Sequence, residues 1–304
     1  MASNMTKMYW LQAITPLHVG AGKGVGFIDM PIMREKVTNW PFVPGSAVKG
    51  VLRDLFTQIR DREQDPAKKK TLSEEIMAAF GQGGTNLESN AGSLVFTDAH
   101  IVCMPIRSLY GTFAYVTSPI VLARLKRDLE AAGGTKVPAN ITIAGDETVL
   151  TSKTPKIVHD NRIFFEDLDF PVDSANQIAD LWATYLSKKI YPSDATWQTT
   201  FNERFAIVSD NTFTFLAMQG SEVSAHIKID DTRKIVKKGA LWYEEALPSE
   251  TILAGIAWCD RVYRKGVTEN DIHTTFCGNE LKNIQIGGKA TVGKGRARCL
   301  FTQG

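Results

Sequence analysis

A glycine-rich loop near the N-terminus carries two side chains suited to proton transfer. Four glycines at alternate positions lie between His18 and Asp29, and such a loop can shape its backbone around a ligand. Next to a phosphodiester, the isolated carboxylate of Asp29 can hold a divalent metal ion or take the proton from an attacking 2′-hydroxyl. His18 is a candidate acid or base, although a histidine at the end of a strand is more often a hydrogen-bonded structural residue. Asp29 is therefore the stronger candidate of the two.

A second segment, residues 45–53, has the composition of an anion-binding helix start. Ser46, Lys49 and Arg53 are spaced by three and four residues, so on a helix they share one face. The N-terminus of a helix favours phosphate because its first N–H groups are unpaired and its dipole is positive there. The alternative is a capping serine followed by two solvated cations. The spacing favours phosphate binding only slightly.

A third segment, residues 287–296, is a glycine loop near the C-terminus. Gly288, Gly293 and Lys294 match most of a nucleotide-binding P-loop, but Gly295 stands where a serine or threonine must bind magnesium. This mismatch argues against a nucleoside triphosphatase. The loop can instead contact a polyanion through its backbone N–H groups, or it can be a tight hairpin between two final strands. The sequence leaves both interpretations open.

The elements that must position these residues form an irregular mixture of strands and helices. An apolar strand over residues 8–14 precedes the first loop, and a helix over residues 46–59 follows it. Alternation predicts a hairpin in which residues 224–230 and 235–243 pair across a turn. Further helices are predicted over residues 73–80, 119–132 and 174–189, and further strands over residues 94–103, 137–143, 162–165, 205–208, 213–217 and 251–259. This order predicts the α+β class, one core with long insertions, rather than a doubly wound sheet.

The composition is that of a soluble globular protein: 304 residues, of which 43% are hydrophobic and 22% are charged. The net charge of +2 is small, but lysines and arginines gather in clusters, so one face can bind a polyanion while others pack against protein. No transmembrane run and no signal-peptide pattern is found in the sequence. The four cysteines are widely spaced, which argues against a zinc site and for reduced thiols. We therefore expect a cytoplasmic protein with no membrane partner.

Several phrases spread along nearly the whole chain carry a family resemblance. They are Thr-Pro-Leu-His-Val-Gly-Ala-Gly at residues 15–22, Ile-Asp-Met-Pro-Ile-Met-Arg-Glu-Lys at 28–36, Pro-Gly-Ser-Ala-Val-Lys-Gly-Val-Leu-Arg at 44–53, the run from Pro-Ile-Arg-Ser-Leu-Tyr to Thr-Ser-Pro at 105–119, Lys-Gly-Ala-Leu-Trp-Tyr-Glu-Glu at 238–245, and the glycine loop. In content and order they resemble the RAMP superfamily of CRISPR–Cas proteins. Within it, the sequence is similar to the repeated backbone subunit of the type III-B effector, the Cmr complex.

The resemblance implies a fold and an assembly. It implies one RAMP domain over residues 1–304, with a ferredoxin-like (RRM-like) palm, finger insertions at about residues 60–92 and 135–170, and a projecting thumb β-hairpin within about residues 205–245. Copies of such a subunit stack along a CRISPR guide RNA, beside the other subunits of the effector. Each thumb separates the guide from the complementary target RNA at regular intervals, so the expected partners are RNA and protein.

The resemblance also implies roles for individual residues. In this family a loop aspartate, here Asp29, cuts the target RNA in a reaction that depends on a divalent metal ion, which we expect to be Mg²⁺, and His18 matches as a secondary residue. Glu244 and Glu245 match a family phrase and either assist near the cut or belong to a structural loop. The implied RNA contacts are Ser46, Lys49, Arg53, Gly288, Lys289, Gly293, Lys294, Gly295 and Arg296, with Lys228, Arg233 and Lys234 on the thumb.

Three other functions stay open at this level. The chain could be a non-catalytic guide-RNA scaffold, a stand-alone ribonuclease that matures guide RNA, or the equivalent backbone subunit of a type III-A effector. The lack of a clear histidine partner for the loop aspartate disfavours the stand-alone ribonuclease. The phrases Ile-Asp-Met-Pro-Ile and Trp-Tyr-Glu-Glu favour type III-B over type III-A.

Overall fold

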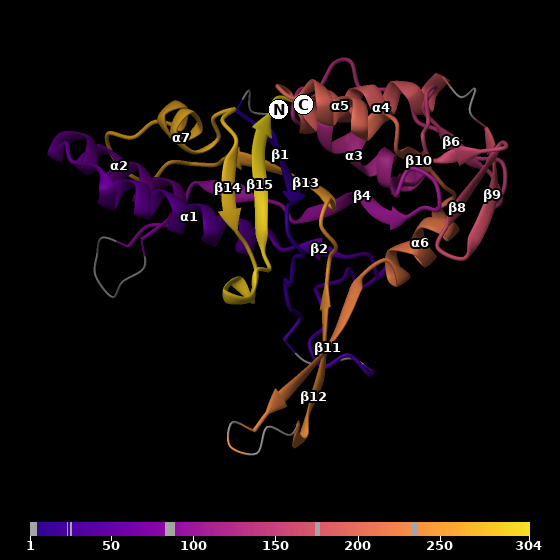
Figure 1. The fold of residues 1–304 in the computed structure, drawn as a ribbon. Helices are drawn as coiled ribbons and strands as arrows, with labels where there is room; N and C mark the ends of the chain where they lie inside the picture. The colour runs from indigo at the N-terminus through magenta and orange to yellow at the C-terminus, as the bar shows by residue number, and fades with distance from the viewer. Residues whose placement is uncertain are drawn as a thin grey trace.

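A large mixed sheet forms the body of the protein (Figure 1). The computed structural model describes residues 5–22, 24, 26–82, 89–173, 177–230, 232 and 236–304. Thirteen strands belong to this sheet. Eleven of them follow one path, in the order β14 (Lys282–Gln285), β15 (Arg296–Thr302), β1 (Lys7–Ala13), β13 (Ile252–Cys259), β4 (Ala99–Arg107), β5 (Phe113–Thr117), β10 (Phe205–Ile207), β6 (Val149–Thr151), β9 (Leu168–Asp173), β8 (Arg162–Phe165) and β7 (Val158–His159). Off this path, β2 (Phe42–Val43) pairs with β4, and β3 (Leu94–Phe96) pairs with β13.

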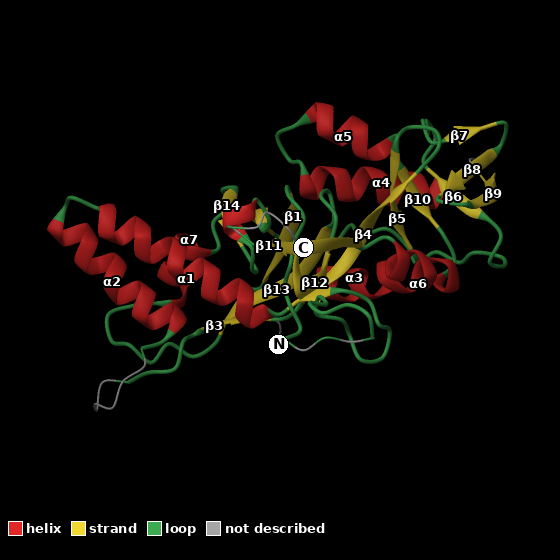
Figure 2. Cartoon of the chain, turned by 60° about the horizontal axis from the view of Figure 1, so that its bottom comes forward, coloured by secondary structure: helices red, strands yellow, loops and turns green. Residues whose placement is uncertain are grey.

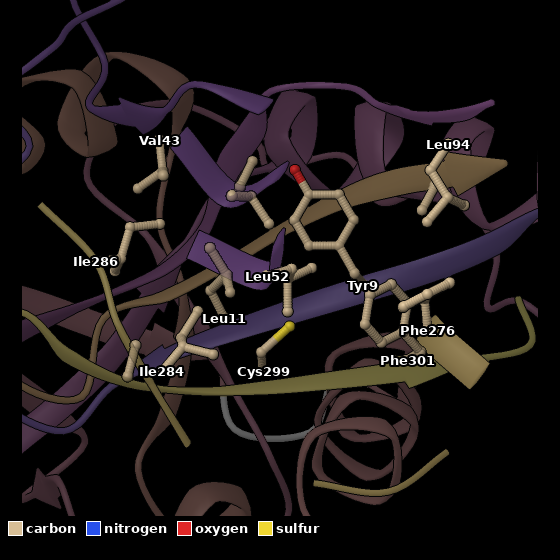
Figure 3. Close-up of a cluster of buried hydrophobic side chains, with 14 of the residues drawn as sticks. Tyr9, Leu11, Val43, Leu52, Leu94, Phe276, Ile284, Ile286, Cys299 and Phe301 are labelled. Atoms are coloured by element: carbon tan, nitrogen blue, oxygen red, sulfur yellow. The ribbon is translucent and has the colours of Figure 1, made fainter. Parts of the chain in front are cut away.

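Strand β1 is a central strand that is buried on both faces. It pairs antiparallel with β13 on one side and with β15 on the other. Tyr9 and Leu11 belong to one hydrophobic core, whereas Met8 and Trp10 belong to a second. Because successive side chains of a strand point to opposite faces, a strand between two cores must be apolar at nearly every position. This explains why the sequence here is a continuous apolar run. Figure 3 shows Tyr9 and Leu11 packed in the first core.

Two groups of helices cover these cores (Figure 2). Helices α1 (Gly45–Arg62), α2 (Pro66–Phe80) and α7 (Glu269–Phe276) contribute residues to the core that holds Tyr9. Helices α3 (Pro119–Ala131), α4 (Gln177–Ile190) and α5 (Ala195–Asn202) contribute to the core that holds Trp10. A third core lies around β4, β5 and α6 (Asp210–Gln219). The mixture of a large sheet with helices confirms the mixed character predicted from the sequence.

A separate two-stranded hairpin projects away from the body (Figure 1, orange). Strands β11 (Glu222–Ile229) and β12 (Val236–Ala246) pair antiparallel, with Ser224 opposite Glu244 and His226 opposite Trp242. This confirms the predicted hairpin. The end of β12 returns to the body, because Leu247, just beyond it, forms a β-bridge with Leu17.

Two predicted strands are wrong. Residues 213–217 lie inside α6, whose N-cap residue Ser209 accepts a hydrogen bond from the N–H of Thr212. Residues 137–143 form no strand although the structure describes all of them. Ile141 is instead buried in the core around Trp10 as part of an irregular segment, and Trp182 donates its indole N–H to the carbonyl of Ala139. Residues 137–143 thus have a strand-like apolar pattern because part of the segment is buried, although it forms no strand.

Other predictions differ only in their bounds. The helix predicted over residues 73–80 begins earlier, since Asp65 caps α2 through the N–H groups of Ala67 and Lys68. The strand predicted over residues 94–103 is divided into β3 and β4. All four cysteines are free and buried. Across the described ranges, we find no helix that combines the length and apolarity needed to cross a membrane.

Candidate functional site

The Asp29 loop is attached to strand β12 near the base of the hairpin. Met30 donates its N–H to the carbonyl of Tyr243 at 3.0 Å, and Glu245 donates its N–H to the carbonyl of Met30 at 3.0 Å. The Oδ2 atom of Asp29 accepts a hydrogen bond from the N–H of Tyr243 at 2.8 Å. The carboxylate is otherwise exposed. One oxygen is therefore held by a main-chain donor, while the other has no hydrogen-bond partner among the described residues.

His18 is held by the same strand, two residues further on. Its Nδ1 atom lies 2.6 Å from the carbonyl oxygen of Glu245. A carbonyl can only accept, so Nδ1 carries the hydrogen and Nε2 is left with its lone pair in the neutral ring. The side chain is buried, with 7% of its surface exposed. Because Asp29 and His18 are anchored at Tyr243 and Glu245, their anchors are about 7 Å apart along the strand.

The side chain of Glu245 fastens the hairpin to the segment that follows Asp29. Its Oε2 atom accepts the N–H of Ile32 at 3.0 Å. Its Oε1 atom accepts from the guanidinium of Arg34 at 2.6 Å and from the hydroxyl of Ser221 at 2.8 Å. The carboxylate is 3% exposed. Both oxygens are thus occupied by protein groups, and the arrangement gives Glu245 a structural task.

Glu244, on the opposite face of β12, is surrounded by cations. Its Oε1 atom accepts from the ammonium of Lys289 at 2.6 Å and from the indole N–H of Trp242 at 2.7 Å. Its Oε2 atom lies 3.4 Å from Nε2 of His226 and 3.9 Å from Nζ of Lys294. Burial alone would raise the pKa of Glu244, but the hydrogen bonds from Lys289 and Trp242 and the nearby positive charge outweigh it and lower the pKa to about 2. The group is ionised at neutral pH and has no proton to donate.

The glycine loop connects β14 to β15 and is docked on the segment before the Asp29 loop. Gly288 donates its N–H to the carbonyl of His18 at 2.9 Å, and Gly295 donates to the carbonyl of Pro16 at 2.9 Å. At Gly287 the backbone has φ +81°, and an added Cβ would lie 2.4 Å from the His18 carbonyl oxygen. Only glycine fits this approach. The hairpin interpretation of the loop is confirmed, and its backbone N–H groups at Gly288 and Gly295 are already used.

Gly293 and Arg296 are loop positions that are open to solvent. Gly293 has φ +84°, and an added Cβ would meet nothing within 4 Å. Arg296 donates its main-chain N–H to the hydroxyl of Thr15 at 3.0 Å, while the residue itself is exposed. The guanidinium of Arg296 is therefore available to a polyanion.

The three predicted anion-binding residues of helix α1 make different contacts in the structure. Ser46 caps nothing, since Pro44 is the N-cap residue and the N–H of Gly45 donates to Oδ1 of Asp98 at 2.8 Å. The capping role considered for Ser46 is therefore wrong, and a carboxylate of the protein already occupies one of the first N–H groups. Lys49 donates its ammonium inward to the carbonyl of Leu94 at 2.7 Å, and burial lowers its pKa.

Ser46 and Arg53 are the exposed members of this face of α1. Arg53 lies in an open groove of about 550 Å³, together with Gly50 and Arg60. On the hairpin, Lys228 is exposed on β11. The predicted contacts Arg233 and Lys234 lie outside the described residues.

The structure therefore brings part of the predicted set together. Several predicted residues meet around the base of β12: Asp29, His18, Glu244, Glu245 and the lysines of the glycine loop. The predicted residues of helix α1 take no part in these contacts. Sequence reasoning missed Arg34, Ser221 and Asp98, which bind or cap through contacts distant in sequence. Arg34 lies within the motif at residues 28–36, but nothing in that motif indicates that Glu245 is its partner.

No preformed metal cage is present in the part of the chain that the structure describes. No group of three or more histidine, cysteine, aspartate or glutamate side chains there could hold a metal ion. Asp29 offers one carboxylate oxygen that has no hydrogen-bond partner among the described residues. Mg²⁺ typically keeps several waters and takes one or two carboxylates together with substrate phosphates. The donor set at Asp29 fits that mode.

Known families match nearly the whole chain. A family model described as the RAMP superfamily matches residues 10–298. The chain is 31% identical over 305 residues to the CRISPR system Cmr endoribonuclease Cmr4 of Pyrococcus furiosus, covering 96% of this chain and 94% of that protein. It is 24% identical to the CRISPR system CMR subunit Cmr4 of Saccharolobus solfataricus, covering 95% and 94%.

Solved structures show the same fold. A crystal structure of oligomeric Cmr4 from Pyrococcus furiosus superposes with a TM-score of 0.75 at 27% identity, covering 99% of both chains. A chain of the type III-B Cmr-beta complex in its apo state superposes with a TM-score of 0.73 at 21% identity, covering 100% of this chain and 99% of that one. At this lower identity the likeness concerns the fold alone.

Proposed function

The chain belongs to the RAMP superfamily, and we propose that it is the repeated backbone subunit of a type III-B CRISPR effector, an RNA-guided endoribonuclease that cuts target RNA complementary to its guide. The full-length relative at 31% identity, named as a Cmr endoribonuclease, supports this assignment. The observation that carries the catalytic part is the exposed Asp29 carboxylate, held by the N–H of Tyr243 at the base of a projecting hairpin.

The arrangement of strands supports a ferredoxin-like palm. Six elements occur along the chain in the order β1, α1, β4, β13, α7 and β15, with other elements inserted between some of them. This is the β-α-β-β-α-β order of that fold. Their four strands lie side by side as β15, β1, β13 and β4, all antiparallel to their neighbours. We assign the palm to this unit, and the insertions to about residues 60–92 and 135–170 of a single domain.

The hairpin β11–β12 is our candidate for the thumb, within the predicted range of about residues 205–245. Ile227 and Leu241 lie opposite each other on it and are 49% and 54% exposed. Apolar side chains that lie unprotected on a projecting element can enter between base pairs and unstack them. This pair suits a hairpin that separates guide from target, with Lys228 meeting phosphates.

Asp29 acts on the phosphodiester that the thumb exposes. The target's 2′-hydroxyl attacks the adjacent phosphorus, a 2′-oxygen–phosphorus bond forms, the bond to the 5′-oxygen breaks, the departing 5′-oxygen takes a proton from solvent, and the 2′-hydroxyl proton is lost. Asp29 either accepts this proton or binds the metal ion that assists the step. Mg²⁺, when bound through the free oxygen of Asp29, would stabilise the charge that develops on the phosphate. His18 presents Nε2 as the second proton-transfer group.

Guide RNA is bound through shape and charge. Ser46, Arg53 and Arg296 are exposed in the structure, whereas Lys289 is partly exposed and Lys294 is mostly buried beside Glu244. Backbone contacts of this kind position RNA without reading its sequence, which base pairing then supplies. Further copies of the chain and other subunits of the effector are the expected protein partners, and the cytoplasm is the expected compartment.

Target cleavage by a reconstituted effector tests the proposal. One complex carries the wild-type subunit, one carries Asp29→Ala, and one carries Asp167→Ala as a control at another exposed aspartate. All three are matched for guide-RNA content. A regular ladder of cuts that is lost only with Asp29→Ala supports the nuclease. A ladder that persists with Asp29→Ala would make the chain a scaffold and move catalysis elsewhere.

A further inference from the structure

The cluster around Glu244 is a buried ionic arrangement with an incomplete set of hydrogen bonds. Glu244 is 2% exposed. Its Oε1 atom is saturated by Lys289 and Trp242. In contrast, Oε2 of Glu244, Nε2 of His226 and Nζ of Lys294 are buried atoms without a hydrogen-bond partner among the described residues. The three atoms lie close to one another, since Oε2 of Glu244 is 3.4 Å from Nε2 of His226 and 3.9 Å from Nζ of Lys294, so this side of the cluster is held by charge rather than by hydrogen bonds.

The charges of the cluster hold the glycine loop against the hairpin. Lys289 and Lys294 face the Glu244 carboxylate, and Glu222, at the start of β11, interacts with the charge of Lys294. Lys289 donates a hydrogen bond of 2.6 Å, whereas Lys294 stands 3.9 Å from the carboxylate. Lys289 is therefore the main ionic partner of Glu244, and Lys294 adds a weaker attraction.

Strand β12 connects this cluster to the catalytic loop. Side chains alternate along a strand, and here the alternation separates two sets of contacts. Trp242 and Glu244 take part in the cluster with the glycine loop, while Tyr243 and Glu245 contact the segment that carries Asp29. A shift of β12 relative to the glycine loop therefore also displaces the donor that holds Asp29.

We propose that Glu244 is a positioning residue that locks Lys289 and Lys294 to the base of the hairpin. Through β12, this lock keeps Asp29 in register with the bound guide. The inference rests on the proposed function and deepens it. Glu244 itself contacts no substrate, because its carboxylate is buried and enclosed by protein cations. The geometry of cleavage, rather than the binding of guide RNA, thus depends on this ion pair.

A double-mutant cycle on the assembled effector tests the lock. Glu244→Gln keeps the shape of the side chain but removes its charge, and Lys289→Met removes the partner. We expect each single variant to retain guide RNA within about twofold of wild type and to cut target about tenfold more slowly, an effect of the size found for coupled charged pairs. The double variant should cut no more slowly than the slower single variant. Glu280→Gln, at an exposed glutamate, is the matched control.

Two results would overturn the inference. Cleavage at the wild-type rate with Glu244→Gln would show that no lock is needed. Losses that multiply in the double variant would show that Glu244 acts independently of Lys289, as a catalytic residue would. Glu244→Asp retains the charge and should recover part of the lost rate. It also guards against a folding defect of Glu244→Gln, since a recovery requires the carboxylate itself.

A second readout separates failure of the lock from failure of the proposed nuclease. Thermal unfolding of the full-length chain, measured for the same cycle, reports the coupling between Glu244 and Lys289 without any RNA. Additive shifts in Tm would overturn the lock even if cleavage depends on Asp29. Conversely, if Asp29→Ala cuts normally, the nuclease assignment fails, while non-additive Tm shifts still support the ion pair.

Discussion

The carboxylate of Asp29 accepts a hydrogen bond from the main-chain N–H of Tyr243 at 2.8 Å. Because the donor belongs to the backbone of a paired strand, it cannot rotate away as a side-chain donor can. The candidate catalytic carboxylate is therefore oriented by the hairpin, and its second oxygen has no hydrogen-bond partner among the described residues. A substitution can therefore remove the charge of Asp29 while keeping its hydrogen bond to the N–H of Tyr243.

Asp29→Asn should abolish cleavage with little effect on folding. The amide oxygen can still accept the N–H of Tyr243, but the charge needed for a base or a metal ligand is lost. We expect target cleavage to fall by about 10²-fold or more, in the range of a lost general base. The free energy of unfolding should stay within about 0.5 kcal/mol, as for exposed substitutions. Cleavage kinetics and urea unfolding measure the two effects, and a rate near wild type would contradict the assignment.

Glu245→Ala should destabilise the fold strongly. Removal of the carboxylate leaves Arg34, whose side chain is 15% exposed, without its partner and leaves the N–H of Ile32 unsatisfied. Breaking one side of a buried ion pair typically costs about 3–5 kcal/mol. Urea unfolding of the full-length chain checks the loss. Glu280→Ala, at an exposed position, is the control and should change stability by less than about 0.5 kcal/mol.

Gly287→Ala should be far more harmful than Gly293→Ala. Both glycines have positive φ, +81° and +84°, so both substitutions strain the backbone by about 1–2 kcal/mol. Only at Gly287 would the new Cβ lie 2.4 Å from the His18 carbonyl oxygen, which forces the loop off its docking segment. Denaturant unfolding of the two variants should therefore give clearly different losses. Equal losses would mean that the close approach to His18 is not maintained in solution.

Because of His273, the free energy of unfolding should decrease as the pH falls. The side chain is 5% exposed, and neither ring nitrogen has a hydrogen-bond partner among the residues described. Burial, and secondly the charge of Lys7, lower its pKa from 6.5 to about 4. The unfolded state therefore binds a proton first, so stability that is present above pH about 6.5 is lost as the pH falls toward 4.

A phenylalanine at this position removes the titration. His273→Phe should make the free energy of unfolding less dependent on pH between 6.5 and 4 than in wild type. Urea unfolding at pH 8 and at pH 5 provides the comparison. An unchanged difference between the two pH values would show that other groups account for the acid sensitivity.

Arg53 and Lys49 should differ in how they affect RNA binding. Arg53 is exposed on α1, so Arg53→Met should weaken guide-RNA binding and reduce the slope of log K against log salt by about 0.7, the value for one phosphate contact to a single strand. Lys49 donates inward to the carbonyl of Leu94. Lys49→Met should therefore act mainly on stability and leave the salt slope unchanged. Binding titrations at several salt concentrations decide between equal and unequal slopes.

Local patterns predicted the elements of this fold better than their partners. Helices α1 and α3 follow from helical spacing because one face of each is buried. The hairpin follows from the alternation of apolar and polar residues, although no side chain of β11 is buried. Residues 213–217 were misassigned because their aromatic and β-branched content suits a strand, whereas the Ser209 cap starts a helix three residues earlier. The cap was visible in the sequence, and giving it more weight would have corrected the assignment.

The candidate site was predictable in its residue types and unpredictable in its contacts. Asp29 was singled out because it stands alone in a glycine loop. That Lys289 binds Glu244, or that Asp98 occupies the N-terminus of α1, depends on tertiary contacts separated by 45 and 53 residues. Charged side chains read from a sequence look equally available to RNA. Only packing shows which of them are already neutralised by the protein.

The alternation of contacts along the base of β12 limits how this hairpin can change in length. One residue inserted between Trp242 and Glu245 would turn every following side chain to the opposite side of the strand, and the two loops would exchange their binding partners. Insertions near the turn have no such effect, because the base stays in place. We therefore expect homologous chains to differ in the number of residues at the tip of the hairpin and to keep the same number at its base.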